Sequence, residues 1–214
     1  MDREIKKEIH LQRVLPAEIE KRSFEIITEE LGDRQLDPIK APIIKRVIHT
    51  TADFDYADSL CFSENAVERL KSAICGGACI VTDTQMARAG INKRELAKHG
   101  GEVFCFMSDD DVAEAARRER TTRAVASMNK AAALDRRLIF AIGNAPTALA
   151  RLYELIEEGV CAPEGIIGVP VGFVNVIEAK ELILASDVPY IVARGRKGGS
   201  NVAAAICNAL LYAC

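Results

Sequence analysis

The last third of the chain repeats one pattern, in which a short apolar segment is followed by a turn and then by a helix. The apolar segments are residues 138–142 (LIFAI), 165–169 (GIIGV) and 190–193 (YIVA). Segments that are apolar at every position are typical of strands buried on both faces of a parallel sheet. The pattern therefore predicts an α/β fold, a single doubly wound domain with a mostly parallel sheet and helices on both faces.

Elements earlier in the chain fit the same architecture. Two more strands are predicted at residues 78–81 (ACIV) and 103–107 (VFCFM). A helix is predicted over residues 16–31, and another over residues 64–74 with Ser63 as its N-cap, because apolar residues recur there at helical spacing.

Composition indicates a soluble protein. Hydrophobic residues make up 49% of the chain and charged residues 28%, as in ordinary globular domains. The first residues, MDREIKKEIHLQR, are too charged for a signal peptide, and no apolar run approaches the roughly 20 residues that span a bilayer. A net charge of -3 provides no basic field for nucleic acid. We therefore expect a cytoplasmic protein without a membrane or nucleic-acid partner, one domain over residues 1–214 with an N-terminal extension at 1–15.

The turns that follow the predicted strands carry the residues best suited to binding. The carboxyl ends of parallel strands lie at one edge of the sheet, where doubly wound proteins bind ligands. Four turns should meet there: residues 82–84 (TDT), 143–147 (GNAPT), 170–173 (PVGF) and 194–200 (RGRKGGS). The last of these is rich in glycine, so its amides can approach an anion closely. It matches neither the Walker A nor the GxGxxG pattern, and a helix-start turn with solvated charges explains it equally well.

Several polar residues near these turns allow two interpretations each. Asn144 either caps the helix that follows it or points its amide at a ligand. Arg123, at a predicted helix start, and Arg46, in an apolar setting, are either solvated or matched by a bound anion. A neighbouring acidic group lacks the spacing of a calcium loop, so we assign it to capping or solvation: Asp53, Asp55 and Asp58.

The cysteines and histidines are the side chains that could serve as metal ligands or catalysts. The chain has seven cysteines, and only Cys75 and Cys79 lie four apart, without a second pair, so we expect reduced, buried thiols and no metal site. Histidine is the side chain whose charge most readily changes near neutral pH. His10 and His99 lie in charged, helix-like contexts, whereas His49 follows residues 43–48, an apolar-basic segment that suits a strand as well as a helix. His49 is therefore the candidate proton donor, although a lone histidine is more often structural.

Seven segments together resemble the precorrin-8X methylmutase family of cobalamin biosynthesis. They run in family order from about Arg22 to the C-terminus, and the combination is far more specific than any one of them. The segments are residues 22–27 (RSFEII), 46–49 (RVIH), 83–87 (DTQMA), 122–123 (TR), 143–149 (GNAPTAL), 168–174 (GVPVGFV) and 195–200 (GRKGGS).

The resemblance implies an isomerase that moves a methyl group from C-11 to C-12 of precorrin-8X or its cobalt complex, giving hydrogenobyrinate or cobyrinate. Such a rearrangement needs no methyl donor, no cofactor and no protein-bound metal. His49 matches the catalytic histidine of the family, which donates a proton to the ring. The family acts as a homodimer with sites near the subunit interface. Ser23 and Arg46 match substrate-contacting positions of the family. The other residues that we expect to bind substrate are Thr50, Asp83, Met86, Arg123, Asn144, Gly172, Arg196, Lys197, Gly198 and Ser200.

Two other functions compete with this one. A non-catalytic tetrapyrrole carrier would keep the same pocket and bind without turnover. A phosphate- or nucleotide-binding enzyme would use residues 195–200 instead, without the Walker and Rossmann patterns. The sequence does not distinguish the cobalt-containing substrate from the metal-free one.

Overall fold

The structure, a computed structural model, describes residues 12–214. His10 and most of the expected N-terminal extension, 1–15, lie outside the described residues. The domain that we expected over residues 1–214 is divided into two compact units, Met1–Arg34 and Gln35–Cys214.

The smaller unit contains the predicted N-terminal helix. A 3-10 turn, Pro16–Glu18, leads into α1, Ile19–Leu31. Arg22 donates hydrogen bonds of 3.3 Å to both Glu25 and Glu29, which lie on the same side of α1. Pairs at this spacing give a helix modest support.

The larger unit is built on a sheet that has six strands among the described residues, in the order β1-β6-β5-β4-β2-β3. Only β1 pairs in the antiparallel sense, and the other strands are parallel. The order of the parallel strands reverses between β2 and β4, which makes this position the topological switch point where ligands of doubly wound folds bind. The strands are β1 (Leu60–Phe62), β2 (Cys79–Thr82), β3 (Val103–Phe104), β4 (Leu138–Ile142), β5 (Gly165–Gly168) and β6 (Tyr190–Ala193).

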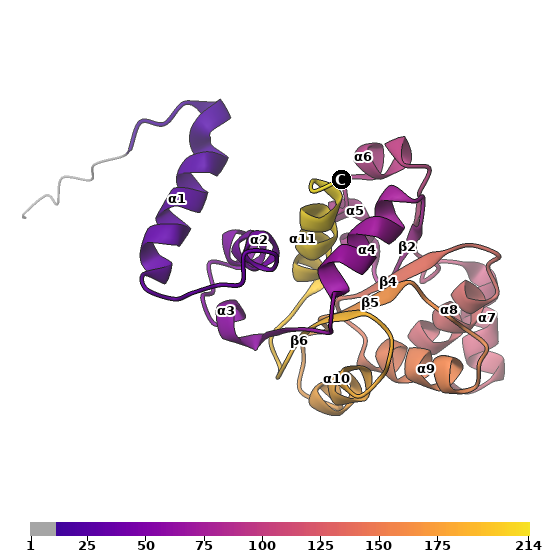
Figure 1. Cartoon of the computed structure of the whole chain (residues 1–214). Helices are drawn as coiled ribbons and strands as arrows, with labels where there is room; N and C mark the ends of the chain where they lie inside the picture. The colour runs from indigo at the N-terminus through magenta and orange to yellow at the C-terminus, as the bar shows by residue number, and fades with distance from the viewer. Residues whose placement is uncertain (1–11) are drawn as a thin grey trace, which may run out of the picture. The chain divides into compact units, whose positions relative to one another are not determined.

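Helices cover both faces of the sheet, which confirms the predicted doubly wound α/β fold. One face is covered by α4, α5 and α11, and the other by α8, α9 and α10 (Figure 1). Helix α2 packs on α11, and α7 packs on α8. The helices of this unit are α2 (Ala41–Thr51), α3 (Tyr56–Ser59), α4 (Ala66–Cys75), α5 (Gln85–Gly90), α6 (Lys93–Lys98), α7 (Asp110–Arg118), α8 (Arg123–Ala132), α9 (Pro146–Glu157), α10 (Val176–Leu184) and α11 (Ser200–Leu211). Within residues 12–214 we find no helix with the length and apolar character to cross a membrane.

Two local predictions need correction. Ser63 does not cap α4, because the chain enters that helix through Asn65 in the left-handed region, with φ 53°. Ser63 instead exchanges hydrogen bonds with Tyr190, whose N–H donates to its hydroxyl at 2.9 Å. The ambiguous segment 43–48 lies within helix α2, which packs on α11 and buries apolar residues at helical spacing, Val47 among them.

The expectation of reduced, buried thiols is wrong for Cys75 and Cys214, which form a disulfide and are both exposed. Cys75 ends α4, and Cys214 follows α11 on the same face of the sheet. The two cysteines are 139 residues apart in the sequence, so no local pattern indicated that they are neighbours in the fold. The other cysteines are free and at least partly buried, as expected.

Candidate functional site

Asp83 joins the two turns at the switch point. It directly follows β2, and its side chain is fully buried. One carboxylate oxygen accepts the N–H of Gly143 at 2.9 Å, and the other accepts those of Asn144 at 2.8 Å and Ala145 at 2.6 Å. Burial raises the pKa of Asp83, and the three N–H donors act in the opposite direction by stabilising the carboxylate. The arrangement assigns to Asp83 the positioning of the turn after β4.

Asn144 is exposed and does not cap the helix after it. Helix α9 begins after Ala145, for which no side-chain cap is formed, while the carboxylate of Asp83 accepts the turn N–H groups instead. The Asn144 side chain therefore remains available at the carboxyl edge of the sheet.

Two glycines allow the turns to pack closely. A Cβ at Gly143 would lie 2.6 Å from the Cα of Ser200. A Cβ at Gly198 would collide with the carbonyl oxygen of Val169. The Ser200 hydroxyl also lies 2.7 Å from that of Thr84, in hydrogen-bond contact. The predicted gathering of these turns at one sheet edge is therefore borne out for the turns after β2, β4, β5 and β6.

Lys197 is balanced by acidic residues from the segment after α2. Its ammonium donates to Asp53 at 2.7 Å and to Asp55 at 2.6 Å. These bonds raise the pKa of Lys197, and the bond from Lys197 lowers the pKa of Asp53. The acidic residues thus have a partner that the sequence did not reveal, and the Gly-rich turn is tied to the end of α2.

Arg196 lies beside the turn after β5. Its guanidinium lies 6.0 Å from the ring centre of Phe173, and its backbone carbonyl accepts the N–H of Gly172 at 3.2 Å. Among the residues that the structure describes, no carboxylate forms an ion pair with Arg196, whereas Arg194 is paired with Glu181 at 2.9 Å. Arg196 is therefore the cation of this turn that is best placed to meet an anionic ligand.

Exposed apolar side chains surround these turns. Phe173 is 86% exposed, Val174 77% and Met86 71%, although side chains of this kind are usually covered. Phe173 and Val174 follow β5, and Met86 lies on α5 directly after β2. This edge of the sheet therefore offers both apolar surface and cations.

Arg123 begins α8 at the same edge. The hydroxyl of Thr122, which caps α8, lies 3.3 Å from that of Thr147 in the first turn of α9. Because α9 starts directly after β4, this contact places the start of α8 near the turn 143–147. Arg123 itself is exposed.

His49 lies in the last turn of α2 and is exposed. It lines a cavity of about 280 Å³ between α2 and α11, together with Arg46 and Thr50. The guanidinium of Arg46 lies 5.6 Å from the ring centre of Tyr212, and the Thr50 hydroxyl donates to the Arg46 carbonyl at 2.9 Å. The structure thus brings together the three residues from α2 that the sequence had singled out.

The opposite wall of this cavity contains residues that the sequence analysis missed. Asn201 and Asn208, seven residues apart on α11, both line it. The Asn208 amide donates to the Gly90 carbonyl at 2.9 Å, and its oxygen accepts the N–H of Asn92 at 2.9 Å. The sequence did carry a signal for these two residues, because asparagines seven residues apart share one face of an otherwise apolar helix.

Ser23 lies on α1, in the smaller unit. Its role therefore stays a prediction from the sequence.

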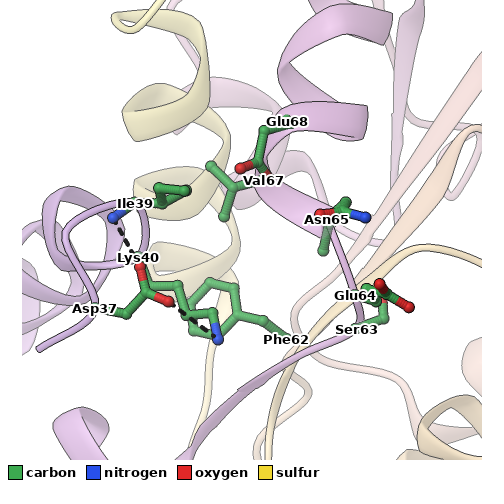
Figure 2. A pocket seen from close by; sticks show the side chains of 10 residues that line it. Asp37, Ile39, Lys40, Phe62, Ser63, Glu64, Asn65, Val67 and Glu68 are labelled. Carbon is green, nitrogen blue, oxygen red and sulfur yellow. Dashed lines mark hydrogen bonds and ion pairs between the residues drawn. The ribbon is translucent and has the colours of Figure 1, made fainter.

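A second cavity, of about 250 Å³, differs in chemistry (Figure 2). Phe62, on its wall, pairs with Ile191 in the register of β1 and β6, away from the carboxyl end of β6. Figure 2 shows Asp37 bonded to the N–H of Ile39 and paired with Lys40. The Lys40 ammonium lies 3.6 Å from the Asp37 carboxylate. The wall also carries Glu64 and Glu68, which makes it acidic and unsuited to a carboxylate-rich ligand.

Comparison with known proteins identifies relatives of this chain. A family model described as "Precorrin-8X methylmutase" matches residues 18–213. The chain is 49% identical to "Cobalt-precorrin-8 methylmutase" of Salmonella typhimurium over 92% of this chain and 95% of that protein. It is 48% identical to a protein of the same name from Priestia megaterium, with 92% of this chain and 88% of that protein covered. It is 35% identical to "Precorrin-8X methylmutase" of Pseudomonas aeruginosa, over 90% and 93% respectively.

A solved structure has the same fold. The precorrin-8X methylmutase structure from Thermus thermophilus superposes with a TM-score of 0.82 at 40% sequence identity, covering 91% of this chain and 96% of that chain.

Proposed function

This chain belongs to the precorrin-8X methylmutase family and is an isomerase of cobalamin biosynthesis, and we propose that His49 is its catalytic proton donor. The reaction moves a methyl group from C-11 to C-12 of the tetrapyrrole. The observation that carries the proposal is the cavity between α2 and α11, which His49 lines together with Arg46 from α2 and Asn201 from α11.

The reaction is an isomerisation, so atoms are neither gained nor lost overall. Protonation of the macrocycle by the His49 imidazolium makes the ring more electron-poor, which favours migration of the methyl group with its bonding electrons. As the product forms, the ring returns a proton and the imidazolium is restored. Binding of the ring in one orientation lowers the barrier further.

Substrate binding follows from the chemistry of the sheet edge. A tetrapyrrole with carboxylates around its rim combines a large apolar face with several negative charges. Phe173, Val174 and Met86 offer apolar contact area to such a ring. Arg196 and Arg123, together with Arg46 in the cavity, offer guanidinium groups to its carboxylates.

We assign the cobalt-containing substrate to this chain. The relatives named for cobalt-precorrin-8 reach 48% and 49% identity, whereas those named for precorrin-8X reach 35% and 33%, and the Thermus thermophilus structure of that name reaches 40%. Cobalt-precorrin-8 would then be converted to cobyrinate, and the metal enters as part of the substrate.

We also propose a homodimer in which each subunit helps to enclose the other's site. The support is the exposed apolar group Met86, Phe173 and Val174, since apolar residues this exposed commonly mark an interface or a ligand site. Light scattering of the purified chain tests this directly, and a mass of 23.3 kDa, that of one chain, would contradict the dimer.

The proposed activity is tested by two measurements on the same proteins. Cobyrinate binding is followed by its absorbance spectrum, and conversion of cobalt-precorrin-8 is followed by product formation. We compare wild type with His49→Ala and with His99→Ala, a matched histidine variant on the loop after α6. Saturable binding with turnover in wild type and His99→Ala supports the isomerase, whereas saturable binding without turnover in wild type would identify a carrier instead.

A further inference from the structure

Lys180 is a fully buried cation near the sheet edge, and neither the proposed catalysis nor the proposed substrate contacts use it. It lies on α10 among residues that face the sheet, with Val176, Ala179 and Ile183 at the neighbouring buried positions. A lysine among these positions is unusual, because burial disfavours the charged ammonium. That burial lowers the pKa of Lys180 to about 8.

The ammonium of Lys180 contacts the Gly-rich turn. It donates to the backbone carbonyl of Gly195 at 2.7 Å and to that of Lys197 at 2.8 Å. The carbonyl between them, that of Arg196, accepts the N–H of Gly172 instead. Lys180 therefore binds alternate peptide groups of the turn from its inner side.

These bonds determine where the amides of the turn point. In a trans peptide the carbonyl and the following N–H point in opposite directions, and no cis bond occurs in residues 12–214. Because the carbonyls of Gly195 and Lys197 point at Lys180, the N–H groups of Arg196 and Gly198 point away from it. Two N–H groups directed to one side of a glycine-rich turn can donate together to one anion.

The outer side of the turn is restrained as well. The Lys197 side chain is bonded to Asp53 and Asp55, and the Gly199 N–H donates to the Val169 carbonyl at 2.8 Å. With Lys180 on the inside, the backbone has contacts on both sides and at its end. Its amides are therefore oriented before any ligand arrives, which reduces the entropy lost on binding.

We propose that Lys180 is a positioning residue, which orients the amides of Arg196 and Gly198 so that they bind one peripheral carboxylate of the substrate beside the Arg196 guanidinium. Lys180 does not touch the substrate. The inference rests on the proposed function, because it assigns a carboxylate of the tetrapyrrole to this turn.

The test compares Lys180→Met, which keeps the length of the side chain without its donors, with Lys180→Gln, a milder change. The control is Leu155→Ala, a buried residue of α9 whose loss destabilises the core without a contact to the turn. Each protein is titrated with cobyrinate and assayed for kcat and KM, and its Tm is recorded.

For Lys180→Met we expect a rise in the Kd for cobyrinate and in KM of at least about tenfold, with kcat changed less than about threefold, because a binding group is misplaced rather than the proton donor. Lys180→Gln should fall between Lys180→Met and wild type. Amide hydrogen exchange should accelerate in residues 194–199 of both variants, and Leu155→Ala should show neither effect at a comparable loss of Tm.

The outcomes separate the two claims. If wild type binds cobyrinate and the Lys180 variants bind it equally well, the positioning role is wrong while the proposed function stands. If Leu155→Ala loses as much affinity as the Lys180 variants at a comparable loss of Tm, the role of Lys180 is merely structural. If wild type binds neither cobyrinate nor its metal-free counterpart, the proposed function is wrong, and so is the proposal that the Gly-rich turn binds a carboxylate of the substrate.

Discussion

The substitution Asp83→Asn tests whether the turn at the switch point depends on a buried carboxylate. Both oxygens of Asp83 accept N–H groups, one from Gly143 and two from Asn144 and Ala145. Asparagine has one acceptor oxygen, so its best rotamer keeps two of these bonds and turns an NH₂ group toward the N–H of Gly143. A buried unsatisfied N–H costs about 1–3 kcal/mol, and the two remaining bonds lose their charge assistance. The relief of burying a charge offsets part of this, which leaves a net loss of about 2–3 kcal/mol.

This loss is measured by urea denaturation and by thermal melting. For a chain of this size it corresponds to a drop in Tm of about 4–12 °C. The matched control is Asp135→Asn, an exposed aspartate between α8 and β4, which should stay within about 0.5 kcal/mol of wild type. Turnover by Asp83→Asn should also fall, since the turn with Asn144 moves. A free energy of unfolding equal to that of Asp135→Asn would refute the reasoning.

Three further predictions concern the Gly-rich turn and the disulfide. Lys197→Met should weaken substrate binding, because Asp53 and Asp55 lose their counter-ion and repel an anionic substrate. Adding Asp53→Asn should restore part of the affinity, and no restoration would mean that Lys197 contacts the substrate itself. Gly198→Ala should raise KM and lower stability by about 1–3 kcal/mol, because the new Cβ meets the Val169 carbonyl; unchanged kinetics and melting would contradict this close approach. Reduction of the Cys75–Cys214 bond should lower the Tm of wild type but not of Cys75→Ser, since a disulfide that closes a loop of this length stabilises the folded state by about 2–5 kcal/mol. Equal changes in Tm on adding reductant would show that the bond is absent.

The sheet could be predicted from the sequence because its strands carry a local signal. Residues 138–142 are apolar at every position and are followed by a turn and a helix, and they form β4 as expected. The antiparallel edge strand β1 was missed because it has three residues, too few for a periodicity to emerge. Residues 43–48 were ambiguous for the same reason, and their helical form is fixed by packing on α11.

The sequence indicated which residues belong to the site more readily than it indicated their roles. His49, Arg46 and Thr50 line one cavity, as their spacing on a helix allows. Asp83 was named as a substrate-binding residue, and that role stays a prediction. The structure shows its buried carboxylate accepting N–H groups from the backbone of a turn sixty residues away. No sequence pattern reports such a long-range contact, because it depends on which strands are neighbours in the sheet.

The burial of Lys180 has a signal in the sequence. Its position among the buried residues of α10 is visible in the sequence as a lysine at helical spacing from Val176 and Ile183. A buried lysine requires acceptors, so the sequence could have indicated that some partner exists. The partner itself, the backbone of the Gly-rich turn, becomes evident only when β6 is placed beside β5.

The role of His49 is the central claim, and a single-turnover experiment tests it most directly. Cobalt-precorrin-8 is mixed with an excess of enzyme, and the rate of cobyrinate formation is measured for wild type, His49→Ala and His99→Ala. We expect His49→Ala to bind the substrate but to slow the methyl migration by about 10²–10⁴-fold, the usual contribution of a positioned general acid, while His99→Ala keeps the wild-type rate. A wild-type rate in His49→Ala at saturating enzyme would contradict the account.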